Sequence, residues 1–84
     1  MPKEVVDDDV PDVDDVPPDI LDAMIGQLPV GYRTVLNLYV FEQLSHKDIA
    51  KRLGIKESSS ASQFFHAKKL LAEMIRKYRY SQAI

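Results

Sequence analysis

Apolar side chains recur every three or four positions from residue 18 onward, which is the spacing of a buried stripe on an α-helix. Proline is tolerated in the first turn of a helix, so the first predicted helix begins near Pro18, and Gly26 and Pro29 help to end it. A second helix is predicted over about residues 30–42. The apolar stripes of the two helices are Ile20, Leu21, Met24, Ile25 and Leu28, followed by Tyr32, Val35, Leu36, Tyr39 and Val40.

The middle of the chain has the layout of a helix-turn-helix. Ser45 opens a short third helix as its capping residue, and Asp48 stands three positions later in the place of a capping box. Ala50 is small enough for two helices to cross closely, and Gly54 in the turn can adopt a positive φ without a steric penalty. The residues expected in the core here are Ile49, Ala50, Leu53 and Ile55. They would hold the next helix at a fixed angle, so that its outer face reaches a major groove of DNA.

The fourth helix is predicted to begin at Glu57 or Ser58 and to continue to about Tyr78. Ser60 falls on its inner side, where we expect the hydroxyl to bond a backbone carbonyl one turn earlier. The apolar residues of this inner side are Phe64, Ala67, Leu71, Met74, Ile75 and Tyr78. The predicted fold class is therefore all-α, a small four-helix domain that contains a helix-turn-helix.

The beginning of the chain has a different composition. Residues 1–17 hold one basic and seven acidic residues, and proline occurs four times up to residue 18. Such a segment lacks the apolar mass to pack, so we expect a disordered acidic linker or tail over residues 1–17 and a folded domain over residues 18–84. A functional alternative to a solvated tether is a self-inhibitory mimic of DNA that covers the basic half of the chain.

The charge is divided between the two ends. The formal net charge of the whole chain is -2, but residues 43–84 hold nine basic against three acidic residues. A basic surface is what binding to the phosphates of duplex DNA requires, although an ordinary solvated surface has a similar composition.

Composition also excludes several classes of function. The chain has no cysteine, which rules out disulfides and a thiolate-ligated metal, and it has no apolar run long enough to span a membrane. His46 and His66 are twenty residues apart without a cluster of further ligands, so no metal or cofactor is expected. The run of serines at residues 58–60 lacks a nucleophile elbow and is better explained by helix capping, so we expect no enzymatic activity. The expected location is the cytoplasm.

The stretch LPVGYRTVLNLYVFEQLSHKDIAKRLGIKESSSASQFFHAKKLL resembles region 4 of bacterial sigma-70 family factors of the extracytoplasmic-function type. The resemblance covers about half of the chain. It implies a domain that docks on the flap of the RNA polymerase β subunit and places its last helix in the major groove of the −35 promoter element. An anti-sigma factor is a further partner that the family implies.

Four apolar residues of the second helix are expected mainly in the core, although some of them could form a partner groove. They are Tyr32, Leu36, Tyr39 and Phe41.

The resemblance also indicates which residues face DNA. Helical periodicity turns Ser58, Ser62, Phe65, His66 and Lys69 away from the buried Phe64. By analogy with the family, the candidates for contact with bases or adjacent phosphates are Ser59, Ala61, Ser62, Gln63 and His66, with Lys56 and Lys69 on the DNA backbone. Paired hydrogen bonds from Gln63 would suit adenine.

Three positions depart from the pattern of the family. It usually has a basic residue at the position of Ala61, often serine at that of Phe65, and arginine or lysine at that of His66. Fewer fixed charges predict weak DNA binding by the domain alone. Three roles stay open for Phe65: contact with a thymine methyl group, contact with a protein, and exposure without a role.

Two other functions compete with promoter recognition. One is a response-regulator type of transcription factor, and the other is a module that binds polymerase or an anti-sigma factor with little affinity for DNA.

Overall fold

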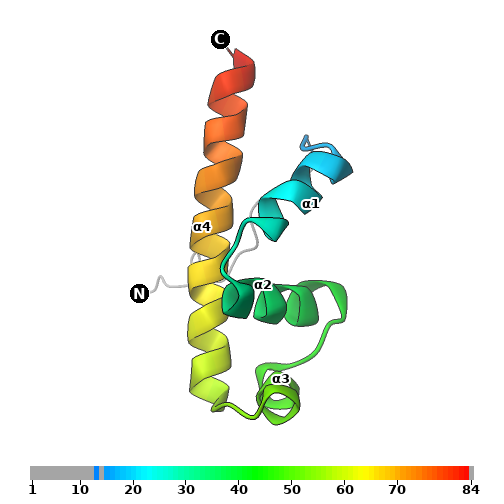
Figure 1. Cartoon of the computed structure of the whole chain (residues 1–84), viewed down its shortest axis with the longest axis vertical. Coiled ribbons are helices and arrows are strands. Elements are labelled where there is room, and N and C mark those ends of the chain that lie inside the picture. Colours follow the sequence, from blue (N-terminus) through cyan, green and yellow to red (C-terminus); the bar gives the residue numbers. More distant parts are fainter. Residues whose placement is uncertain (1–12, 14, 84) are drawn as a thin grey trace, which may run out of the picture.

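The computed structural model describes residues 13 and 15–83 of the chain. Its elements, in chain order, are α1 (Pro18–Gly26), α2 (Val30–Leu36), the π-helical turn η2 (Asn37–Phe41), α3 (His46–Leu53) and α4 (Glu57–Ala83). The long helix α4 forms one wall of the molecule, and α1, α2 and α3 lie one after another along it (Figure 1). The predicted all-helical fold with four helices is confirmed. None of the helices in the described part is long and apolar enough to cross a bilayer.

The core lies between α4 and the three shorter helices. Val35 and Leu36 of α2 are buried against the middle of the molecule, and Ile49 of α3 is buried near the beginning of α4. The residues that α4 contributes to this cluster are Phe64, Ala67, Leu71 and Ile75, with Met74 and Tyr78 packed at its edge. The stripe predicted for the fourth helix therefore faces the core along most of its length.

The second predicted helix changes its geometry halfway. After Leu36 the backbone widens into η2, where the Glu42 N–H donates to the Asn37 carbonyl at 3.2 Å. The wider turn changes which side chains face the core: Leu38 is buried, whereas Tyr39, predicted to lie on the buried stripe, is 36% exposed. Sequence periodicity assumes a uniform α-helix, which is why the prediction for Tyr39 was wrong. Phe41, expected mainly in the core or in part in a partner groove, is 58% exposed and lies outside the core.

The ends of α3 follow local capping rules. The Asp48 N–H donates to Ser45 Oγ at 3.1 Å, as predicted for a capping residue. At the other end Gly54 has φ 69° and ψ 36°, and the Ile55 N–H donates to the Ala50 carbonyl at 3.0 Å, which together form a Schellman-type stop. The start and the end of this helix are therefore set by the residues next to them.

Two core predictions for this turn were wrong. Leu53 is 37% exposed, and Ile55 is only partly buried and lies outside the buried cluster. The burial of Ile49 and Ala50 shows that α3 is covered over its middle, so its last turn and the residue after Gly54 lie at the edge of the core. Ile49 and Ala50 therefore anchor α3, and Ile55 contributes less than its position suggested.

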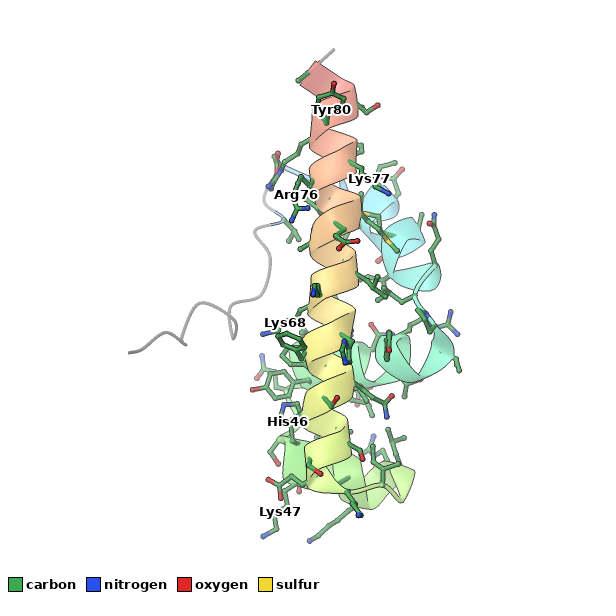
Figure 2. The ribbon with its side chains drawn as sticks, turned by 90° about the vertical axis from the view of Figure 1, so that its left-hand side faces the viewer. His46, Lys47, Lys68, Arg76, Lys77 and Tyr80 are labelled. Atoms are coloured by element: carbon green, nitrogen blue, oxygen red, sulfur yellow. The ribbon has the colours of Figure 1, made fainter. Side chains whose placement is uncertain are left out.

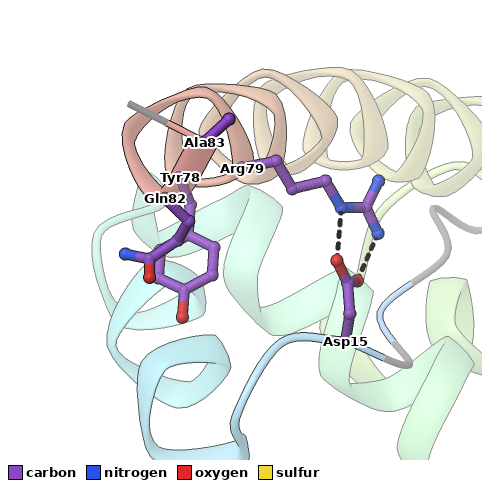
Figure 3. A pocket seen from close by; sticks show the side chains of 5 residues that line it. All are labelled: Asp15, Tyr78, Arg79, Gln82 and Ala83. Carbon is purple, nitrogen blue, oxygen red and sulfur yellow. Dashed lines mark hydrogen bonds and ion pairs between the residues drawn. The ribbon is translucent and has the colours of Figure 1, made fainter.

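The packed chain begins a few residues earlier than Pro18. Val16 is only 6% exposed, and Val13 packs against the core. Asp15 and Arg79 form a bidentate ion pair with N–O distances of 2.6 and 3.0 Å (Figure 3). The hydrogen bond from Arg79 holds the pKa of Asp15 below its ordinary value. The disorder predicted for the rest of the acidic segment falls on residues 1–12 and 14, which lie outside the described residues.

The turn at Gly54 makes a direct prediction about stability. Gly54→Ala places a Cβ on a left-handed residue and should lower the free energy of unfolding by about 1 kcal/mol. Gly26→Ala is the matched control, because an added Cβ at Gly26 would meet no atom within 4 Å and the backbone there has no positive φ. It should be neutral or stabilise the domain by up to about 1 kcal/mol. Urea unfolding measures both, and equal effects would contradict the role assigned to Gly54.

Candidate nucleic-acid interface

The outer side of the first half of α4 carries most of the predicted DNA-facing residues. Because α3 and the core cover the side of Phe64, the opposite side faces solvent. The predicted residues that the structure leaves exposed are Lys56, Ala61, Ser62, His66 and Lys69. Ser59 and Gln63 are partly buried. Ser62, His66 and Lys69 thus form a continuous polar strip along nearly two turns of the helix.

The beginning of α2 borders this strip. The Tyr32 and His66 rings are stacked with centroids 5.7 Å apart and an angle of 25° between their planes. A Cβ added to Gly31 would lie 2.6 Å from Gln63 Oε1, so the glycine leaves the space that the Gln63 carboxamide occupies. Sequence reasoning assigned neither Gly31 nor Tyr32 to the interface. Both lie against residues, Gln63 and His66, that were expected to contact DNA.

Phe65 is 41% exposed, as predicted from its place on the helix. Its ring meets the ring of His66 edge to face, with centroids 5.5 Å apart and an angle of 72°. Phe65 also borders a small pocket, which is lined as well by Tyr39, His46, Ala61, Phe64 and Lys68. The exposed aromatic ring is therefore next to the strip and at the edge of a depression with both polar and apolar walls.

His46 and Ser60 form a contact that sequence reasoning did not find. Ser60 is completely buried, and its Oγ lies 2.9 Å from His46 Nδ1. The prediction that the hydroxyl bonds a backbone carbonyl one turn earlier was wrong, because α3 places an imidazole within its reach. The His46 ring also stacks on Tyr39, with centroids 4.4 Å apart. Burial lowers the pKa of His46 from its ordinary value of 6.5, Glu57 raises it and Lys68 lowers it further.

The basic residues of the second half do not all lie on the polar strip. Lys68 is buried, and its Nζ lies 4.9 Å from the centroid of the Phe64 ring. Arg79 is paired with Asp15, and Arg52 lies 3.7 Å from Glu42. Lys56 and Lys69 are the cations that adjoin the predicted contacts and stay exposed. Figure 2 shows Lys47 beside the first turns of α4 and Arg76 and Lys77 near its other end.

A capped helix, a glycine turn and a following helix with an exposed polar face define a DNA-binding domain of the helix-turn-helix class. The chain belongs to the sigma-70 region 4 family, whose model matches residues 19–71. The match begins in α1 and ends midway along α4. Neither a curated protein nor a solved structure gives a match.

Membership of this family establishes the general function. Sigma-70 region 4 binds the −35 promoter element during transcription initiation, in association with RNA polymerase. The family is not enzymatic.

Among the described residues, no three histidine, aspartate or glutamate side chains lie close enough together to hold a metal ion.

The environment of His46 predicts how stability depends on pH. Because its pKa is lowered in the folded state, the unfolded chain binds the proton more readily. Its contribution to stability is complete above about pH 6.5 and is lost as the pH falls from there through the lower pKa of the folded state. The midpoint of thermal unfolding, measured between pH 7.5 and about pH 5, should therefore decrease on acidification, and less so in His46→Phe. Parallel curves for the two proteins would contradict this assignment.

Proposed function

We propose that the polar strip of α4 enters the major groove of the −35 element. Ser59, Ala61, Ser62, Gln63 and His66 would face bases or adjacent phosphates in this arrangement. Lys56 and Lys69 would neutralise phosphates of the DNA backbone. The observation that carries the proposal is the exposure of Ser62, His66 and Lys69 on a helix whose opposite side is buried against α2 and α3.

The same strip predicts modest affinity. Ala61 has no charge, and position 66 is a histidine in place of arginine or lysine, so neither position offers the fixed cation that the family usually has there. Each missing phosphate contact weakens binding and its dependence on salt. The domain should therefore bind a promoter usefully only when polymerase or a second DNA-binding domain holds it nearby, which raises its effective concentration.

A second surface suits the docking of polymerase. A shallow hollow of about 550 Å³ lies between α1 and α2, and Phe41 stands exposed at its edge. Ile25 adds apolar surface, while Asp22, Arg33 and Glu42 supply charges around it. An apolar patch with a charged rim is typical of a site for a protein partner. We assign this hollow to the flap of the β subunit and, in an inhibited state, to an anti-sigma factor.

The subtype and the location follow from the same reasoning. The motifs in α2, α3 and α4 resemble the extracytoplasmic-function type of sigma factor, and we assign the chain to that type. Because bacterial RNA polymerase works in the cytoplasm, the domain is expected to act there.

The contact proposed for Gln63 can be tested through base preference. Gln63→Ala should lower discrimination at one base pair of a selected site by about 1–3 kcal/mol. Gln82→Ala, an exposed glutamine near the end of the same helix, is the matched control and should bind like the wild type. Fluorescence titrations with the selected duplex and its single-base variants give the measurement. An unchanged preference in Gln63→Ala would remove Gln63 from the interface.

The contact proposed for Lys69 can be tested through its dependence on salt. Lys69→Ala should weaken binding to all duplexes about equally and reduce the slope of log affinity against log salt by about 0.9. Lys77→Ala removes the same charge about 12 Å farther along the helix and should leave the slope unchanged. Equal binding of promoter and scrambled duplexes by the wild type at low salt would favour a module that binds polymerase or an anti-sigma factor with little affinity for DNA.

A further inference from the structure

The imidazole of His46 lies where three elements meet. It is the first residue of α3, its ring stacks on Tyr39 of η2 with an angle of 16° between the planes, and its centroid is 5.6 Å from that of Phe64 in α4. The Nδ1 atom is joined to Ser60 Oγ, one turn before Phe64. The same ring therefore makes contact with η2 and with α4, from a fixed place at the beginning of α3.

We infer that His46 is a positioning residue for the DNA-reading helix: through its bond to Ser60 it sets the orientation of α4 relative to α3, and thereby the selectivity of the polar strip. This inference rests on the proposed function. His46 itself need not touch DNA. It would act through Ser60, which lies on the buried side of the helix.

The geometry of α4 explains why this bond would affect recognition. Ser60 and Ser62 are two residues apart and so point to nearly opposite sides of the helix. A rotation or shift of the helix that relaxes the contact at Ser60 must move Ser62 by a similar amount. Close packing around Phe64 already limits the movement of the helix, and the hydrogen bond adds a restraint on both distance and angle. The bond thus supplies a directional restraint in addition to that of the core packing.

The surroundings of the bond favour a single arrangement. Ser60 is completely buried, and among the described residues no buried side-chain nitrogen or oxygen atom is left without a hydrogen-bond partner. The hydroxyl can donate or accept, so it can pair with His46 Nδ1 in either tautomer of the neutral ring. Stacking on Tyr39 holds the ring in the plane that this pairing requires.

The experiment compares variants of the full chain by two independent readouts. Backbone ¹⁵N–¹H residual dipolar couplings report the orientation of α3 relative to α4, and titrations give the affinity ratio between a selected and a scrambled duplex. The variant His46→Phe/Ser60→Val removes both partners and keeps apolar volume, which limits the loss of stability. We expect its couplings to fit a changed interhelical orientation. Its affinity ratio should fall by about fivefold or more, which is the lower end of the value of one base contact.

Single variants distinguish positioning from packing. His46→Asn keeps a polar group near the place of Nδ1 and should retain couplings close to those of the wild type, whereas His46→Phe keeps the ring without the bond and should not. Unchanged couplings in the double variant would overturn the inference. If the double variant does not fold, identical couplings in His46→Asn and His46→Phe would overturn it. If the wild type shows no preference between duplexes, the proposed function fails, and the couplings still decide the role of His46.

Discussion

The burial of one side of α4 is the constraint on which the rest of the molecule depends. The three shorter helices have no common core without it, because each contributes only a few apolar residues, such as Ile25, Leu36 and Ile49. Leu71 and Phe64 of α4 lie among these residues in the same buried cluster. A small domain without disulfides or metals must obtain its stability from such a shared surface. The same burial leaves the opposite side of α4 to solvent, where a ligand can reach it.

The electrostatics of the domain follow from this division between a buried and an exposed side. Two cations of the basic half make contacts within the folded domain: Lys68 lies over the ring of Phe64, and Arg79 binds Asp15. The exposed cations among the predicted DNA contacts are Lys56 and Lys69. The excess of basic residues in residues 43–84 therefore overstates the positive charge available to a phosphate backbone.

Much of the fold was predictable because it depends on neighbours in the chain. The caps of α3 at Ser45 and Gly54 involve residues within five positions of one another, and the stripe of α4 follows the helical repeat. The errors have the opposite origin. Leu38 is buried and Tyr39 is exposed because η2 departs from α-helical geometry, and the Ser60 hydroxyl binds His46 because two helices cross there. No local rule reports how a neighbouring helix is placed.

The sequence by itself determined the number and order of the helices, the two ends of α3 and the exposed side of α4, since these depend on backbone preferences and periodicity over a few residues. Only the tertiary structure decided which side chains meet across elements: Gly31 with Gln63, Tyr32 with His66, and His46 with Ser60. The physical reason is that these contacts depend on the distance and angle between helices. Both result from packing and hydrogen bonding between elements that are far apart in the sequence.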